Sequence, residues 1–160
     1  MRVRDVMTRG VECAWSDESI AVAAKKMQRL NVGCLPVRGT SGGLVGMVTD
    51  RDITVRAIAE ASDPTNTAVR DVMTPHVTYC RDDQKLAEAA HLMEEHQVRR
   101  LVVLDSSRQV VGIVSLGDLA VKCPDEQLTG AALEAVSFPA APIRYGEDGA
   151  PLAMPSFIHP

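Results

Sequence analysis

VRDVMT, residues 3–8, occurs again as residues 69–74, and the offset of 66 positions between the two stretches decides the fold. The same offset then continues without a gap to the end of the second copy. Matching pairs include Val11 with Val77, Asp17 with Asp83, Met27 with Met93, Leu35 with Leu101, Gly46 with Gly112, and Asp52 with Asp118. A gapless match of this length indicates a duplicated unit, at residues 3–53 and 69–119.

The two copies share one order of secondary-structure signals. A short strand is expected at Val11–Ala14 and at Val77–Cys80. A helix follows in each copy, because apolar residues recur there at helical spacing. These positions are Ile20, Ala23, Ala24, Met27 and Leu30 in the first copy, and Leu86, Ala89, Ala90 and Met93 in the second. Ser16 or Asp17 can cap the first of these helices, and Asp82 can cap the second.

Two β-rich runs and a second helix complete each copy. The runs lie at 34–38 with 44–49 and at 101–105 with 110–115, joined by residues with turn chemistry. A further helix is expected to open at Asp50 and at Leu116. Each copy is thus a β-α-β-β-α unit, which predicts an α+β fold. Because a unit of about 50 residues buries too little surface to be stable alone, we expect pseudo-twofold packing of the two units.

The expected organisation has four segments. Residues 1–60 form unit one, residues 61–68 form a polar, proline-containing connection, and residues 69–123 form unit two. Residues 124–160 hold a helix at Asp125–Val136 and then an irregular tail that is rich in proline and glycine.

Composition and charge exclude several classes of function. The chain has 160 residues, of which 46% are hydrophobic and only 3% aromatic, and its formal net charge is −4. This balance argues against nucleic acid as a partner, because binding a phosphate backbone needs a basic face. No stretch approaches the ~20 apolar residues of a membrane helix, and the first residues lack the apolar segment of a signal peptide. We expect no membrane association and a cytoplasmic location.

Motifs of the common enzyme classes are not found in the sequence. The glycines at 39, 42, 43 and 46 lack the lysine of a phosphate-binding P-loop, and no nucleophile-elbow motif is present. His91 and His96 are five positions apart, which does not match the i, i+4 pair of a helical zinc site. The sequence therefore predicts no catalytic residue and no metal site.

The four cysteines, Cys13, Cys34, Cys80 and Cys123, are widely spaced and form no C-x-x-C pair. This spacing is typical of reduced, mostly buried thiols. A disulfide or a redox role is the alternative, and Cys13 with Cys34 is the pair to examine.

Three segments that recur in register resemble the cystathionine-beta-synthase-type (CBS) domain pair. They are DVMT at the start of each copy, GCLPV at 33–37 or RRLVV at 99–103, and GMVTDRD at 46–52 or GIVSLGD at 112–118. The resemblance covers residues 3–119. It implies a regulatory rather than catalytic module whose two sheets pack together, with two clefts between the units related by the pseudo-twofold. It also implies that such pairs dimerise through their helices.

The resemblance further implies a binding site for ribose and phosphate. In the family, a glycine, a hydroxyl residue and an acidic residue three positions later bind these groups at the last strand and the helix start. Here the pattern is Gly46, Thr49 and Asp52 in unit one, and Gly112, Ser115 and Asp118 in unit two. A helix N-terminus favours an anion, and a carboxylate can accept from both ribose hydroxyls. A hydroxyl residue followed by Asp is also an ordinary helix-capping arrangement, so both roles stay open.

Arg99 and Arg100 precede the middle strand of unit two, where unit one has glycine and cysteine at 33–34. In nucleotide-sensing relatives, basic residues at this position reach into the clefts and contact phosphates, for which the forked donors of arginine are suited. The alternative is a surface ion pair with Glu94 or Glu95, which would contribute little.

An adenine ring needs an apolar slot, and the resemblance places it against the first strands, the threonines before them and the middle strand. The candidates are Thr8, Val11, Pro36, Thr74 and Val77. Val102 is the counterpart of Pro36 in the second middle strand, and for it we favour a role in the core. Each apolar candidate can equally be a core residue, and the two threonines can instead end the short DVM segments.

We therefore expect a non-catalytic sensor that requires no cofactor, binds AMP, ADP, ATP, S-adenosylmethionine or a related ligand, and signals to a separate protein. A homodimer through the helices is also expected. Ile53 and Ala57 lie on one side of the second helix while Val55 and Ile58 lie on the other, although packing within the chain can account for this pattern. The alternatives are a ligand-free dimeric assembly protein and an unrecognised enzyme or redox protein.

Overall fold

The structure is a computed structural model that describes residues 1–137. Its elements are α1 (Val3–Val6), β1 (Thr8–Arg9), β2 (Ala14–Trp15), α2 (Ile20–Leu30), β3 (Cys34–Arg38), β4 (Leu44–Thr49), α3 (Asp50–Ile53), η1 (Thr54–Ile58), α4 (Val69–Val72), β5 (Thr74–Pro75), β6 (Tyr79–Arg81), α5 (Leu86–His96), β7 (Arg100–Leu104), β8 (Val110–Ser115), α6 (Leu116–Lys122) and α7 (Glu126–Ser137). Segment η1 is a π-helix that continues α3. The irregular tail expected after α7 lies outside the described residues.

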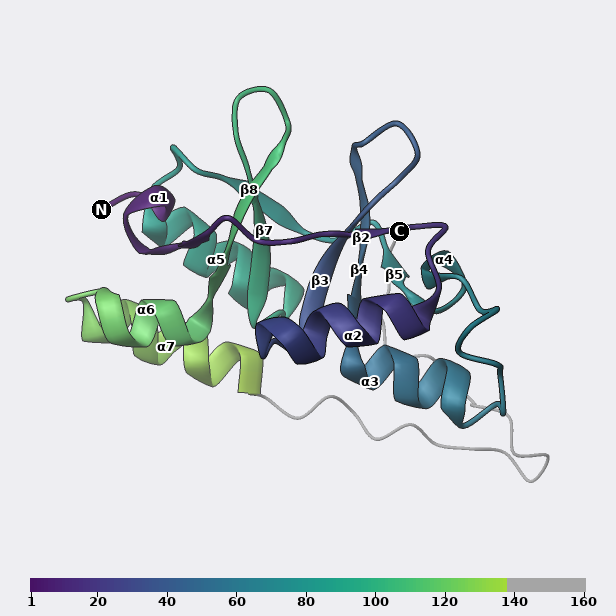
Figure 1. Cartoon of the computed structure of the whole chain (residues 1–160). Helices are drawn as coiled ribbons and strands as arrows, with labels where there is room; N and C mark the ends of the chain where they lie inside the picture. Colours follow the sequence, from purple (N-terminus) through teal and green to yellow (C-terminus); the bar gives the residue numbers. More distant parts are fainter. Residues whose placement is uncertain (138–160) are drawn as a thin grey trace.

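Two four-stranded sheets exchange their edge strands. One sheet has the order β2-β3-β4-β5 and the other has the order β6-β7-β8-β1. Strand β1 comes from unit one but pairs antiparallel with β8, and β5 comes from unit two but pairs antiparallel with β4, beside which it lies in Figure 1. The exchange is reciprocal. The exchanged strands occupy matching positions in the two copies, because Thr8 of β1 and Thr74 of β5 are 66 residues apart.

The short helices before the exchanged strands cross over with them. Val3 of α1 lies in the hydrophobic core of unit two, and Val69 of α4 lies in the core of unit one. The backbone N–H of Val3 donates to the carbonyl oxygen of Gln84 at 3.0 Å, and that of Val69 donates to Glu18 at 2.9 Å. The α+β class and the pseudo-twofold pair of β-α-β-β-α units are thereby confirmed.

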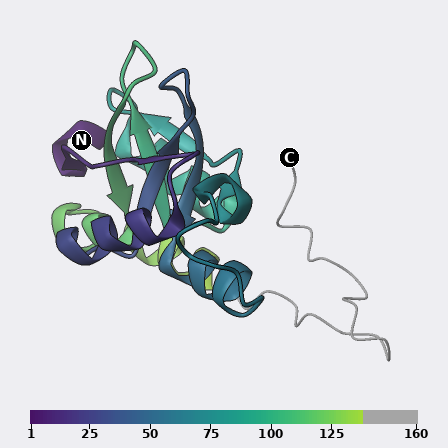
Figure 2. The ribbon, with the colours of Figure 1, turned by 45° about the vertical axis from the view of Figure 1, so that its right-hand side comes forward.

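A layer of helices covers one side of the strands. Helices α2, α3, α6 and α7 lie together below the strands in Figure 1, and the turned view of Figure 2 shows the same layer. Helix α7 confirms the helix expected at Asp125–Val136, and it packs on α5 and α6 of unit two. Its buried residues Ala132 and Val136 belong to the core of that unit. Among residues 1–137, unit one has no equivalent helix.

The hairpin strands and the helix starts that follow them are confirmed. Strands β3 and β4 coincide with the predicted runs at 34–38 and 44–49, and β7 and β8 agree to within one residue. The second helices open at Asp50 and Leu116, as the sequence predicts.

The predicted first strands, Val11–Ala14 and Val77–Cys80, have wrong bounds. Strand β2 begins only at Ala14 and β6 only at Tyr79, because these are the first residues that reach the parallel register of β3 and β7. The preceding residues instead lead from the exchanged strands across the molecule. Helices α1 and α4, of four residues each, were not predicted.

The predicted caps of the first helices are also wrong. Ser19, rather than Ser16 or Asp17, caps α2 and accepts a hydrogen bond from the Val22 N–H at 3.4 Å. Helix α5 has no side-chain cap, so Asp82 has another role. The carbonyl oxygens of Ser16 and Asp82 accept backbone hydrogen bonds from α4 and α1, respectively. These residues secure the exchanged helices.

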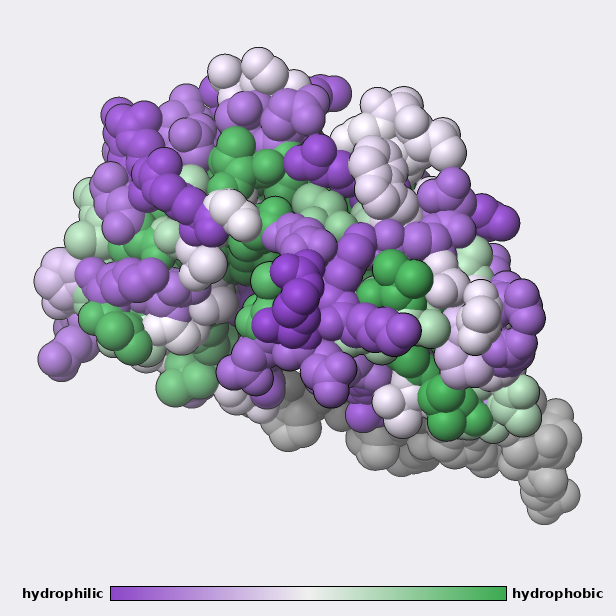
Figure 3. Space-filling model, in the orientation of Figure 1, coloured by the Kyte–Doolittle hydropathy of each residue, from purple (hydrophilic) through white to green (hydrophobic). Residues whose placement is uncertain are grey.

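The α3–η1 stretch is apolar on two sides, but only one side is buried. Ala57 is fully buried and Ile53 packs against the core of unit one. On the other side, Val55 and Ile58 are 49% and 53% exposed. Figure 3 shows hydrophobic surface at this lower right end of the molecule.

Gly112 of β8 pairs with Arg9 of the exchanged strand β1. A Cβ on Gly112 would lie 2.5 Å from the carbonyl oxygen of Thr8, a backbone atom that cannot rotate away. We expect Gly112→Ala to lower the free energy of unfolding by about 1–3 kcal/mol, the usual cost of overpacking. Urea denaturation midpoints measure this effect.

Gly130→Ala is the control, because Gly130 lies in α7 with open space around its Cβ position. This substitution should raise stability by about 0.5–1 kcal/mol through helix propensity. Equal midpoints for wild type and Gly112→Ala would show that β1 does not need the glycine.

Candidate functional site

Two clefts open between the units, and each has the size of a small-molecule site. We name them the Asp52 cleft, of about 430 Å³, and the Asp118 cleft, of about 440 Å³. The Asp52 cleft is lined by Met47, Thr49, Asp52, Arg56, residues 74–78, His96, Val98, Arg99 and Arg100. The Asp118 cleft is lined by residues 8–12, residues 30–36, Arg100, Ile113, Ser115 and Asp118.

The clefts bring together eleven of the thirteen predicted site residues, and each cleft draws on both units. Thr49 and Asp52 of unit one meet Thr74, Val77, Arg99 and Arg100 of unit two in the Asp52 cleft. Thr8, Val11 and Pro36 of unit one meet Ser115 and Asp118 of unit two in the Asp118 cleft, which Arg100 also lines. The exchanged strands produce this mixture, because β1 carries Thr8 to β8 and β5 carries Thr74 to β4.

The other two predicted residues, Gly46 and Gly112, line neither cleft. A Cβ on Gly46 would lie 2.7 Å from the carbonyl oxygen of Thr74, so this glycine makes room for β5 as Gly112 does for β1. The close backbone approach that glycine permits is therefore made by the protein's own exchanged strand.

A capping box holds each acidic residue at the start of its helix. In the Asp52 cleft, Oδ2 of Asp52 accepts hydrogen bonds from the N–H of Thr49 at 2.9 Å and from its Oγ1 at 2.8 Å, and Oγ1 accepts from the Asp52 N–H at 3.0 Å. The corresponding distances between Ser115 and Asp118 are 2.9, 2.6 and 3.1 Å. The capping role is thus real in both units, and it occupies only one carboxylate oxygen of each Asp.

The second oxygen of each Asp faces a cation one helical turn later. Oδ1 of Asp52 lies 3.5 Å from Nη2 of Arg56, and Oδ1 of Asp118 lies 2.8 Å from Nζ of Lys122. Both cations also donate to a carbonyl oxygen of the exchanged helix, Arg56 to Val72 at 2.8 Å and Lys122 to Val6 at 2.6 Å. Each acidic residue is therefore linked through its cation to the other unit.

Arg99 and Arg100 lie in the clefts and do not make the surface ion pairs that were the alternative. Among the described residues, neither arginine forms an ion pair, and neither guanidinium donates a hydrogen bond to the protein. Both line the Asp52 cleft, and Arg100 also lines the Asp118 cleft.

Seven polar residues that line the clefts were not predicted from the sequence: Arg56, His76, Thr78 and His96 in the Asp52 cleft, and Arg9, Glu12 and Asn31 in the Asp118 cleft. His76 has a left-handed backbone, with φ of 52°, and its counterpart at the repeat offset is Gly10, with φ of 66°. The equivalence of Gly10 and His76 in the repeat was the signal in the sequence that could have indicated a tight turn at this position. It marks a turn that brings the wall of each cleft back toward the strands.

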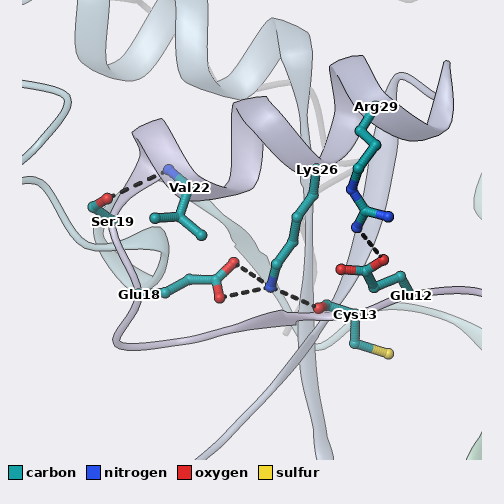
Figure 4. Close-up of polar contacts among 7 residues, drawn as sticks. All are labelled: Glu12, Cys13, Glu18, Ser19, Val22, Lys26 and Arg29. Carbon is teal, nitrogen blue, oxygen red and sulfur yellow. Dashed lines mark hydrogen bonds and ion pairs between the residues drawn. The ribbon is translucent and has the colours of Figure 1, made fainter.

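The outer wall of the Asp118 cleft is fastened to α2 by two ion pairs, drawn in Figure 4. Nη2 of Arg29 lies 2.5 Å from Oε2 of Glu12 at the edge of the cleft. Nζ of Lys26 lies 2.7 Å from Oε2 of Glu18 and donates to the carbonyl oxygen of Cys13 at 3.2 Å. These contacts fix the segment that follows β1, so the wall is held in place without a ligand.

All four cysteines are free, so the disulfide that was an alternative for Cys13 and Cys34 is not formed. Burial raises the pKa of the Cys34 thiol, an effect that Arg100 opposes and Asp50 reinforces. Burial also raises the pKa of Cys80 to about 12. A thiol held in its protonated form is a poor nucleophile, which disfavours a redox role for these two residues.

Residues 1–137 contain neither a cluster of metal ligands nor a helix that could span a membrane. Within residues 1–137, no three His, Cys, Asp or Glu side chains are grouped so that they could hold a metal ion. None of the helices in this described part has both the length and the apolar character needed to cross a bilayer.

Two tandem β-α-β-β-α units, with exchanged edge strands and two clefts that each draw on both units, define a duplicated module. The chain belongs to the CBS-domain family, whose model matches residues 3–58 and 69–124.

The chain is similar to several proteins that are themselves CBS pairs. Hypoxic response protein 1 of Mycobacterium tuberculosis is 35% identical over 125 residues, which is 78% of this chain and 87% of that protein. The crystal structure of Hypoxic Response Protein I, with two coordinated zinc ions, matches with a TM-score of 0.70 at 35% identity and covers 78% of this chain and 100% of that one.

Two solved structures hold adenosyl ligands. The CBS domain pair of protein MJ0100, in complex with 5′-methylthioadenosine and S-adenosyl-L-methionine, is 30% identical with a TM-score of 0.66, covering 75% of this chain and 93% of that one. CBSX2, in complex with AMP, is 29% identical with a TM-score of 0.63, covering 83% and 96%.

The contacts of Asp118 make stability depend on pH. Partial burial opposes ionisation, but hydrogen bonds from Lys122 and Ser115 outweigh it and hold the pKa of Asp118 below its ordinary value. A depressed pKa contributes stability that is complete above the unfolded value of about 3.9 and is lost as pH falls through the folded value. We expect Asp118→Asn to be less stable than wild type by a constant amount above about pH 5, and the difference to narrow below about pH 4.

Urea midpoints measured from pH 7 down to pH 3 give this difference. Asp17→Asn is the control, because Asp17 is exposed and its side chain has no partner among the described residues. A difference for Asp118→Asn that is the same at every pH would contradict the charge-dependent contact with Lys122.

Proposed function

We propose that the protein is a non-catalytic regulatory module that binds an adenine nucleotide or a related adenosyl ligand in the clefts between its CBS units. The observation that carries this proposal is the position of the two capping boxes. Each lies in a cleft of nucleotide size, opposite an apolar wall from the other unit, and each Asp keeps one oxygen outside the box. The adenosyl ligands of the MJ0100 pair and of CBSX2 support the choice of ligand class.

Each part of such a ligand finds a suitable group. The outer carboxylate oxygen of Asp52 or Asp118 accepts from the ribose hydroxyls. The hydroxyl of Thr49 or Ser115 already donates its proton to that Asp, so the phosphates fall to the arginines of the lining. Val77 in one cleft, and Val11 with Pro36 in the other, form the apolar wall for the base. A dissociation constant between about 1 mM and 1 μM needs only ~4 to ~8 kcal/mol of net binding, which these few contacts can supply.

The output of the module is a change in how the two units pack. A ligand in either cleft touches both units, so it stabilises one relative arrangement of them over others. In this proposal a separate protein in the cytoplasm reads that arrangement, and no cofactor is required.

Assembly without a ligand is the second candidate, and the exposed side of η1 favours it. Val55 and Ile58 form an apolar surface on a helix that no described element covers. A homodimer through this helical face is compatible with both functions. A dimer that ignores every nucleotide would leave assembly as the function.

Thermal shift assays with AMP, ADP, ATP, S-adenosylmethionine and guanine nucleotides test the proposal. A ligand present at 100 times its dissociation constant adds about 2.7 kcal/mol of stability, which raises the melting temperature by several degrees. We expect a shift with adenine compounds, and a smaller shift in Asp52→Asn and in Asp118→Asn, because each loses the charged acceptor of one cleft.

The double variant should lose the shift altogether, whereas Asp17→Asn should keep it. Melting curves that no compound moves, together with a stable dimer in size-exclusion chromatography, would favour assembly. A normal shift in the double variant would contradict the role given to the two aspartates.

A further inference from the structure

Arg100 occupies a position that serves both clefts. It is the first residue of β7 and pairs in register with Ser115 of β8, the hydroxyl residue of the Asp118 cleft. The same residue lines the Asp52 cleft beside Arg99. Of the residues that line the two clefts, Arg100 alone is common to both. Its guanidinium has no acidic partner in the described part of the chain, so it is available to an anion.

The repeat explains how one side chain reaches both sites. The counterpart of Arg100 at the offset of 66 is Cys34, which pairs with Thr49 as Arg100 pairs with Ser115. Cys34 and Arg100 both line the Asp118 cleft, and equivalent positions that approach each other lie near the pseudo-twofold axis. Cys34 is small and buried, so it leaves the space at the axis to the single arginine.

The rest of the lining gives the two clefts different charges. In the Asp52 cleft, three arginines (Arg56, Arg99 and Arg100) face one carboxylate. In the Asp118 cleft, Arg9 and Arg100 face two carboxylates, those of Glu12 and Asp118. Arg9 already donates to the carbonyl oxygen of Arg4 at 2.8 Å. The partners of Glu12 and Asp118, Arg29 and Lys122, are not part of the lining.

We propose that Arg100 is a phosphate-selecting residue shared by the two clefts, so that a polyphosphate nucleotide bound in the Asp52 cleft leaves the Asp118 cleft to an adenosyl ligand without phosphate. Arg99 and Arg100 together hold the phosphates in the Asp52 cleft. With Arg100 engaged there, a second nucleotide meets Glu12 and Asp118, and the guanidinium that remains in this cleft is that of Arg9, which already donates to the carbonyl oxygen of Arg4. This inference rests on the proposed function, because it needs both clefts to bind adenosyl ligands.

Calorimetric titration of the full chain tests the sharing, with ATP and the phosphate-free 5′-methylthioadenosine as probes. In wild type, the second ATP should bind at least about tenfold more weakly than the first, since a charged hydrogen bond is worth about this factor. Protein saturated with ATP should still bind 5′-methylthioadenosine. In Arg100→Gln, the first ATP should weaken about tenfold, while the second ATP and 5′-methylthioadenosine should keep their affinities.

The Asp52→Ala variant distinguishes an Arg100 shared by the two clefts from two independent clefts that differ in their affinity for ATP. With the Asp52 cleft disabled, Arg100 is free to serve the Asp118 cleft, so ATP should bind there more tightly than the second ATP binds wild type. Adding Arg100→Gln should remove that gain, whereas adding Arg99→Gln should not. Arg108→Gln is the control, because Arg108 lies in the exposed β7–β8 turn and lines neither cleft.

Two ATP sites of equal affinity in wild type would overturn the sharing. So would an Arg100→Gln substitution that lowers the affinity for ATP in only one of the two proteins, wild type or Asp52→Ala. Both outcomes would leave the proposed function intact. No binding of either probe to wild type, in a protein whose melting curve shows it to be folded, would overturn the proposed function itself and the sharing with it.

Discussion

The reciprocal exchange of β1 and β5 is the constraint on which the rest of the structure depends. Each strand has two residues and is held on the sheet of the other unit, where Gly112 and Gly46 let the backbones approach. The chain after β1 then forms one wall of the Asp118 cleft, and the chain after β5 forms one wall of the Asp52 cleft. Neither cleft exists within a single unit. Packing of the units and formation of the sites are therefore the same event, and any ligand that fills a cleft acts on that packing directly.

The sequence predicted the parts of this fold that are local or repeated. The hairpin strands follow from β-rich runs of five or six residues, and the first helices follow from apolar residues at helical spacing. Each of these signals occurs in both copies of the repeat. The exchange could not be predicted, because a two-residue strand has no periodicity and its partner is more than a hundred residues away for β1. The same limit explains the early bounds of the first strands. Val11 lines a cleft and belongs to no strand, and the apolar pattern of the sequence does not distinguish these two environments.

The candidate site was predictable as a set of residues but not as a geometry. A hydroxyl residue followed by Asp reads equally as a cap and as a ribose site, and the structure makes the two roles compatible. Oδ2 of each Asp completes the capping box, which fixes the side chain, while Oδ1 points to a cation that also contacts the exchanged helix. Pre-organisation of this kind lowers the entropic cost of binding. Arg56 and Lys122 complete the arrangement, and only their matching offset of 66 could have marked them in advance.

Divergence between the two copies matters most where equivalent positions come close together. Far from the pseudo-twofold axis, a substitution in one unit changes one cleft, as Gly10 and His76 illustrate. Near the axis, two arginines at the positions of Cys34 and Arg100 would repel each other. Burial raises the pKa of the Cys34 thiol and keeps it neutral, so this residue adds no charge to that of Arg100. One cation at the axis is thus the stable outcome of the duplication. Because that cation borders both clefts, the proposed sharing of Arg100 follows from the symmetry of the fold.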